Sequence, residues 1–123
     1  MARVNWNAPT IALTVQAVLI GLAGLSLLAG DESALPPKMK TGNVHMTRSI
    51  GHELIIMCFL VVGAIVNNTA QQAQPFLAAG LVVSSWTHIM ADDVGGGVLN
   101  LCIALMHFYF GLVWKEKEAA KKS

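Results

Sequence analysis

The chain has 123 residues, of which 54% are hydrophobic and only 12% are charged, and its formal net charge is +1. Soluble proteins average about 25% charged residues, so this composition indicates a membrane protein and argues against a soluble catalytic domain. A nearly neutral chain also lacks the basic face that neutralises phosphates, which argues against binding to nucleic acid.

Charged residues are absent from three long stretches of the sequence. No Asp, Glu, Lys or Arg occurs in residues 4–30, 54–91 or 94–114. A helix needs about 20 predominantly apolar residues to cross a bilayer, so the first and last stretches each hold one helix and the middle one holds parts of two. The sequence therefore predicts an all-α chain, folded over residues 1–123 as one domain of four transmembrane helices.

The first helix is expected over residues 8–30. Gly30 can adopt the left-handed conformation that commonly ends a helix. The helix carries a stripe of small residues at helical spacing, formed by Thr14, Ala17, Gly21 and Gly24. Such a stripe lets a neighbouring backbone approach closely, so we expect this face to pack on another helix. The segment 31–43 contains two prolines and a Gly-Asn pair, and is expected to be an irregular loop outside the hydrocarbon.

Three further helices follow, separated by short polar connections. They are expected over residues 44–66, 71–91 and 94–114, with Pro75 in the first turn of the third helix. The last residues, 115–123, read as a solvated tail. Short connections between four helices predict an up-down-up-down bundle.

The distribution of basic residues predicts the orientation. If the helices alternate in direction, the two termini share one side, which carries Arg3 and the four lysines of the tail. The other side carries three basic residues: Lys38, Lys40 and Arg48. Five against three predicts both termini on the cytoplasmic side or its equivalent, such as a matrix or stroma.

Polar residues converge at the membrane face opposite the termini. The start of the second helix, the end of the third and the start of the fourth all meet there. The residues concerned are Arg48, His52, Glu53, His88, Asp92, Asp93 and Asn100. Ionisable groups at membrane depth are costly, so they usually face the bundle interior or water. His107 lies about 10 Å deeper along the fourth helix than Asn100.

Some of these residues have simple structural interpretations. Asp92 or Asp93 can cap the fourth helix, and Arg48 can extend to the lipid headgroups. His107 can form a hydrogen bond between helices or, as a weaker alternative, contribute to a cofactor site.

His52, Glu53 and His88 leave two alternatives open. A hydrogen-bonded network among them would join the second helix to the third. A binding pocket is the other alternative: the two histidines can ligate the iron of haem b, or His88 with Glu53 or Trp86 can bind the carbonyl oxygens of a quinone. The residue types also suit zinc, but the tight spacing of a zinc motif is absent, so no metal site is predicted.

Several motifs resemble the DoxX-like family of four-helix membrane proteins. They are the loop "KMK", the start of the second helix "RSIGHELIIMCFLVV" and the end of the third helix "WTHIMADD". The resemblance covers nearly the whole chain and is closest to the branch that contains the endoplasmic-reticulum chaperone for nicotinic acetylcholine receptors. The matching positions are Arg48, Ile50, Gly51, Glu53, His88 and Asp92.

One position departs from the family pattern. Glu53 follows Gly51 by two residues, one position earlier than in the relatives, which turns the carboxylate by about 100° around the helix. The resemblance therefore leaves open whether His52 or Glu53 has the family role.

The resemblance implies two different functions. Some DoxX-like proteins look like membrane subunits of sulfur or quinone redox systems, and others look like assembly factors for membrane proteins. No catalytic motif stands out in this chain, so the sequence favours a small accessory, assembly or structural subunit of a larger membrane complex, without catalysis of its own. The lipid bilayer and other membrane subunits are its predicted partners, and no cofactor is predicted. The alternative is a redox subunit that binds quinone or haem b at the His/Glu cluster.

Overall fold

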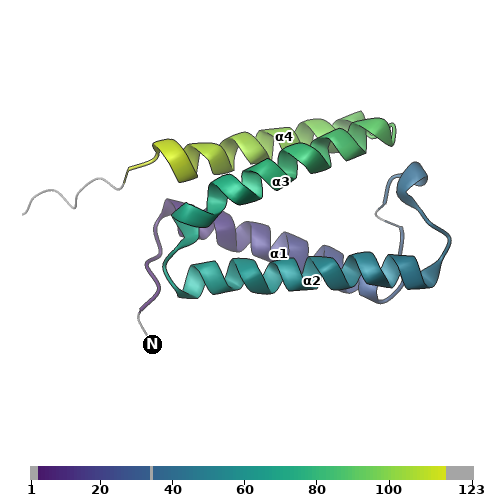
Figure 1. Ribbon diagram of the computed structural model, residues 1–123, viewed down its shortest axis with the longest axis horizontal. Helices are drawn as coiled ribbons and strands as arrows, with labels where there is room; N and C mark the ends of the chain where they lie inside the picture. The colour runs from purple at the N-terminus through teal and green to yellow at the C-terminus, as the bar shows by residue number, and fades with distance from the viewer. Residues whose placement is uncertain (1–2, 34, 116–123) are drawn as a thin grey trace, which may run out of the picture.

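The computed structural model describes residues 3–33 and 35–115, so most of the predicted tail lies outside it (Figure 1). Within these ranges the chain contains four long helices and no strand, which confirms the all-α prediction. The helices are α1 (Ala8–Leu28), α2 (Val44–Val66), α3 (Ala70–Met90) and α4 (Val94–Phe108). A short 3-10 helix, η1 (Pro37–Met39), lies between α1 and α2, and a π-helical segment, η2 (Tyr109–Val113), continues α4.

Three helical segments are long and apolar enough to cross a membrane, which indicates an integral membrane protein. They are α1, α2 and the continuous segment Val94–Val113, formed by α4 and η2. α3 is as long as α1, with 21 residues, but its Gln, Ser, Thr and His side chains make it less apolar. Length and composition therefore identify three candidate spans and not the four predicted.

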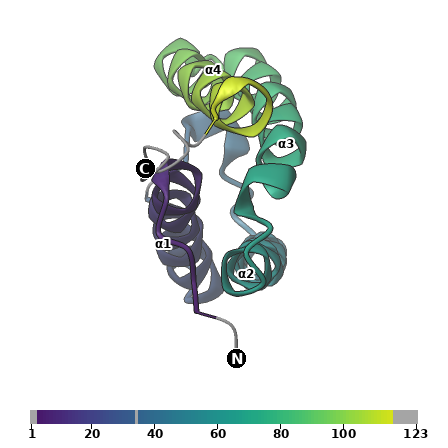
Figure 2. The ribbon, with the colours of Figure 1, turned by 90° about the vertical axis from the view of Figure 1, so that its left-hand side faces the viewer.

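The helices pair as two hairpins, α1 with α2 and α3 with α4 (Figure 1). The end-on view in Figure 2 shows the two pairs facing each other, with much closer contact within each pair than between them. The structure therefore consists of two packed hairpins that meet over a limited contact.

Small residues bring α1 and α2 close together. At Gly51 of α2 a Cβ atom would collide with the backbone at Leu28 and would lie 2.7 Å from the carbonyl oxygen of Gly24. Nearby, the Cys58 thiol donates a hydrogen bond of 3.4 Å to the carbonyl of Ala17. The small-residue stripe of the first helix thus packs on a neighbouring helix, as predicted.

Glycine also allows the close contact between α3 and α4. A Cβ at Gly97 would lie 2.6 Å from the side chain of Ile89, and the Gly97 carbonyl accepts a hydrogen bond of 2.6 Å from the Ser85 hydroxyl. Asp93 caps α4, since its carboxylate accepts a hydrogen bond of 3.0 Å from the amide of Gly96. This confirms the predicted cap.

The two hairpins meet near the beginning of α1 and α3. A buried cluster joins three of the helices there: Leu13, Ala17, Val61, Ile65 and Ala70. The segment before α1 lies on the turn between α2 and α3, where the Asn68 side chain accepts a hydrogen bond of 2.7 Å from the amide of Asn5. Asn68 also donates a hydrogen bond to the Arg3 carbonyl. These bonds hold the N-terminal segment at this end of the molecule.

The predicted position of Pro75 was wrong. α3 begins at Ala70, because the turn after α2 is very short, so Pro75 lies inside the helix and not in its first turn. Proline has no N–H group, and its ring occupies space beside the helix. Gly111 of η2 leaves room for that ring, since a Cβ there would lie 2.5 Å from the Pro75 Cδ.

The last helix also differs from the prediction. The predicted α-helix over residues 94–114 changes into the π-helical segment after Phe108. The wider turn lies opposite Pro75, and its carbonyl groups have a donor from α3. The Gln71 amide donates hydrogen bonds of 3.0 Å to the Phe110 carbonyl and 2.8 Å to the Trp114 carbonyl.

Candidate functional site

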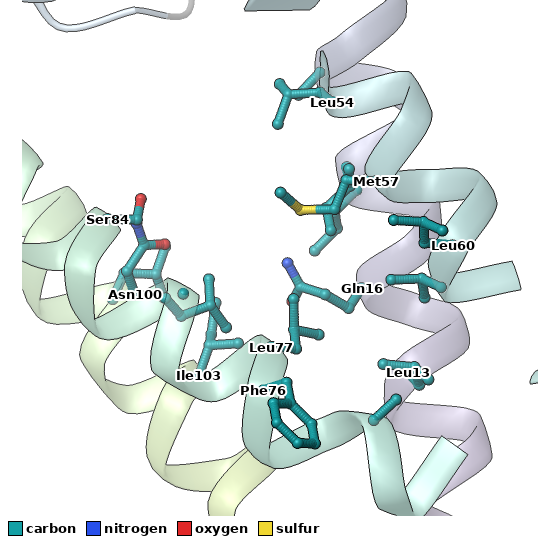
Figure 3. A pocket seen from close by; sticks show the side chains of 18 residues that line it. Leu13, Gln16, Leu54, Met57, Leu60, Phe76, Leu77, Ser84, Asn100 and Ile103 are labelled. Atoms are coloured by element: carbon teal, nitrogen blue, oxygen red, sulfur yellow. The ribbon is translucent and has the colours of Figure 1, made fainter. Parts of the chain in front are cut away.

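A cleft of about 660 Å³ lies between the two hairpins, and all four helices line it (Figure 3). This volume falls within the range of about 300–1,000 Å³ that is typical of ligand sites. Its lining is mostly apolar, with Leu13, Leu54, Met57, Leu60, Phe76 and Ile103 among the side chains shown. The cleft therefore suits an apolar occupant.

Three neutral polar side chains interrupt the apolar lining. Gln16 projects into the cleft from α1, while Ser84 of α3 and Asn100 of α4 lie on the opposite wall (Figure 3). The Asn100 amide donates a hydrogen bond of 3.0 Å to the Ser84 hydroxyl. Every lining residue in the described part of the chain is uncharged.

Sequence reasoning selected Asn100 but missed Gln16 and Ser84 as site residues. A signal for Gln16 was present, because it is the only amide side chain in the first helix. Polar residues within membrane helices often mark functional positions. Ser84 carries a weaker signal, since serine commonly bonds to its own helix.

The predicted convergence of polar residues is only partly realised. Arg48, His52 and Glu53 are exposed on α2, and across residues 3–33 and 35–115 their side chains have no hydrogen bond or ion pair with His88 or any other residue. The face of α2 that packs on α1 contains Gly51. His52 and Glu53 directly follow Gly51 in the sequence, so their side chains point in other directions around the helix. Their proposed binding role stays a prediction.

His88 instead pairs with Asp93 at the end of the α3–α4 hairpin. Its Nδ1 atom lies 2.8 Å from the Asp93 carboxylate. The Gly96 amide, together with the His88 ring, lowers the pKa of the Asp93 carboxyl from its ordinary value. Asp92 forms an exposed ion pair with Lys38, which connects the α1–α2 loop to the α3–α4 turn. Within the described ranges no three His, Cys, Asp or Glu side chains are grouped to hold a metal ion.

Glu32 organises the loop between α1 and α2, a role that the sequence did not reveal. Its carboxylate accepts hydrogen bonds from the Thr47 hydroxyl, from the Thr41 hydroxyl at 2.8 Å and from the Thr41 amide at 3.0 Å. These donors, with Thr47 first in importance, lower the pKa of the Glu32 carboxyl from 4.5 to about 2. The loop is thereby fastened to the first turn of α2.

His107 is completely buried outside the cleft. Its Nδ1 atom lies 3.2 Å from the Gln74 amide nitrogen, which also donates a hydrogen bond of 3.1 Å to the Pro9 carbonyl. The Nε2 atom of His107 and the Oε1 atom of Gln74 are buried without a hydrogen-bond partner among the described residues. The interhelical hydrogen bond expected for His107 is present, and it joins α4 to α3 and α3 to α1.

No protein-family model, curated protein or solved structure matches this chain. The resemblance to DoxX-like proteins therefore stays a prediction.

Proposed function

We propose that this protein is a DoxX-like four-helix transmembrane protein, which acts as a small accessory, assembly or structural subunit of a larger membrane complex without its own catalysis. The proposal rests on the observation that most polar side chains between the helices form hydrogen bonds that join one helix to another. These contacts are His88 with Asp93, Asn100 with Ser84, Ser85 with Gly97, and His107 with Gln74. Such pairs stabilise a scaffold.

The proposal includes α3 as a fourth membrane span in an up-down-up-down arrangement. A polar helix can cross the hydrocarbon when neighbouring helices satisfy its polar groups. Gln71 and Gln74 donate to carbonyls of η2 and of α1, and Ser85 donates to a carbonyl of α4. Each of these polar side chains thus faces protein.

The partners in this proposal are lipids and other membrane subunits, which contact the outer faces of the helices. Large apolar side chains are exposed on every helix, such as Leu22, Phe59, Val83 and Leu105. The described segments outside the helices are short, so a partner has its main contact area on these faces.

The native mass of the complex tests the subunit proposal. The full chain is solubilised from its own membrane in a mild detergent, and its mass and co-purifying proteins are measured. We expect a large assembly in which a second membrane protein is present at fixed stoichiometry. A free monomer or a small homo-oligomer would contradict the proposal.

The redox alternative at His52, Glu53 and His88 can be separated in the same material. A redox subunit with the His88→Ala substitution loses its haem spectrum or its quinone reduction. A structural subunit with this substitution loses only stability or partner yield, because His88 supports the Asp93 cap of α4. We expect the second outcome.

A further inference from the structure

Gln16 presents an amide without a protein partner to the apolar cleft. Only 8% of the residue is exposed, its side chain points into the cleft, and no hydrogen bond joins it to the described part of the chain (Figure 3). The other helical amides in contact with protein, Gln71, Gln74 and Asn100, all have hydrogen bonds. The Gln16 amide atoms are not among the enclosed, unpaired polar atoms of the described residues, which are Gln74 Oε1 and His107 Nε2, so an occupant of the cleft can reach them and form hydrogen bonds.

The opposite wall also has hydrogen-bonding capacity to spare. Asn100 and Ser84 use one amide hydrogen and one hydroxyl lone pair on each other. This leaves the Ser84 hydroxyl hydrogen and the Asn100 carbonyl oxygen free of other bonds across the described residues. The wall can therefore both donate hydrogen bonds to an occupant and accept them.

These polar groups lie at membrane depth. Gln16 is about 12 Å along α1 from its first residue, and Asn100 is about 9 Å along α4 from its first residue, which lies at the opposite end of the molecule (Figure 1). Both positions are well inside a hydrocarbon core of about 30 Å. The occupant is therefore a molecule that enters from the bilayer.

The chemistry of the lining defines the class of molecule. A charged headgroup would be desolvated in the cleft without an ion-pair partner, because every lining residue is neutral. An amide on one wall and a hydroxyl–amide pair on the other match carbonyl or hydroxyl oxygens. The leucine-rich remainder of the lining matches an apolar body.

We propose that the cleft binds an uncharged lipophilic molecule from the membrane through hydrogen bonds of its carbonyl or hydroxyl oxygens to Gln16 on one wall and to Ser84 and Asn100 on the other. This site is separate from the His52, Glu53 and His88 group, none of which lines the cleft. It goes beyond the subunit role and does not depend on the identity of the partner.

Photolabelling tests this proposal on the purified full chain in phosphatidylcholine vesicles. One probe is hexadecanol with a diazirine in its chain, and the second is the alkyl sulfonate of the same length with the diazirine at the same carbon. We expect the alcohol to label the cleft at Met57, Phe76 or Ile103, and the sulfonate to label these positions about tenfold less. Labelled residues are identified by mass spectrometry of the digested protein.

Matched variants assign the binding to the cleft. Gln16→Leu should lower the apparent affinity for the alcohol about tenfold, the equivalent of one hydrogen bond. Gln72→Leu is the control, because Gln72 is exposed on α3 and does not line the cleft. Ser84→Ala provides a second test that removes a hydroxyl and leaves α1 unchanged, and it should also weaken labelling.

Two outcomes would overturn the proposal. The first is equal labelling of the cleft by the alcohol and the sulfonate, unaffected by Gln16→Leu and Ser84→Ala, which means that any lipid chain fills it. The second is the absence of cleft labelling by the alcohol in the unmodified protein, which is expected if a partner helix or the closed hairpins fill this space. Because the chain is tested alone, either result is independent of the native-mass experiment.

Discussion

At the scale of single residues, Gly51 determines how closely α1 and α2 approach. A Cβ atom there would collide with the α1 backbone, whereas nothing lies within 4 Å of a Cβ at Gly63 on the same helix. We expect Gly51→Ala to destabilise the protein by about 1–3 kcal/mol through overpacking. Gly63→Ala should be neutral or stabilising by up to about 1 kcal/mol, because alanine is the better helix former. Equal unfolding midpoints of the two variants in detergent would contradict this contact.

Glu32 makes the stability of the loop depend on pH. Its carboxyl has a folded-state pKa of about 2, below the ordinary 4.5, so the hydrogen bonds of the charged form stabilise the fold above pH 4.5. This contribution is lost as the pH falls from 4.5 towards 2. Glu32→Gln should therefore lower the melting temperature at neutral pH, and the difference from the unmodified protein should shrink over that window.

Glu53→Gln is the matched control for this prediction. Glu53 is exposed, and its side chain has no hydrogen bond within the described ranges. Its replacement should leave the melting temperature nearly unchanged at each pH. A constant difference between Glu32→Gln and the unmodified protein across the acidic range would show that the Glu32 charge does not hold the loop.

The sequence predicted the depth of polar residues better than their direction. Helix order placed His88 and Asn100 near one end of their helices, and both take part in interhelical or capping contacts there. The direction around a helix depends on which face packs, and this is decided by side chains of the neighbouring helix. His52 and Glu53 consequently lie on the exposed surface of α2, while Gln16 points into the cleft.

At the scale of elements, some helix ends were predictable because they depend on local chemistry. Asp93 caps α4, and Gly30 has the expected positive φ of 89° after α1. The change to π-helix after Phe108 was not predictable, since it depends on contacts with a segment more than thirty positions earlier in the chain. Neither Pro75 nor Gly111 signals alone that one accommodates the other.

Gln71 should stabilise the π-helical end of α4. Replacing it by leucine leaves the carbonyls of Phe110 and Trp114 without their side-chain donor, which should cost about 1–3 kcal/mol. We expect Gln71→Leu to lower the unfolding midpoint and to increase amide hydrogen exchange over residues 109–115. Gln72→Leu makes the same chemical change on an exposed position and should alter neither quantity. Matching exchange rates in both variants would rule out a capping role for Gln71.

At the scale of the whole molecule, the number of helices was predictable and their pairing was not. Hydrophobic stretches and polar breaks define four helices, but they do not show that neighbours in sequence pack far more closely than the two hairpins do. That difference arises from Gly51 and Gly97, which let each pair approach closely. The two hairpins contact each other over a limited area at their packed end. The hydrogen bond from Gln74 to the Pro9 carbonyl is part of this contact.

The proposed orientation can be tested by cysteine accessibility. Cys58 and Cys102 are replaced by alanine, and single cysteines are introduced in turn at Asn5, Lys40 and Lys115. Where the cytoplasmic, matrix or stromal side is the enclosed one, a membrane-impermeant maleimide added outside should label the Lys40 position only. The Asn5 and Lys115 positions should react after permeabilisation. Labelling of these two positions from opposite sides would indicate an odd number of crossings, as in a topology in which α3 does not span the membrane.

The pairing of sequence neighbours also has a consequence for biosynthesis. The contact of α1 with α2 is complete in the first 66 residues, so it can form while the ribosome is still making α3. The second pair assembles in the same way from its own residues, held by Ser85 and Gly97. The Gln74 bond to Pro9 then forms when both pairs are present. We therefore expect the nascent chain to mature by docking two finished helical pairs, so that the cleft is created only at the last step.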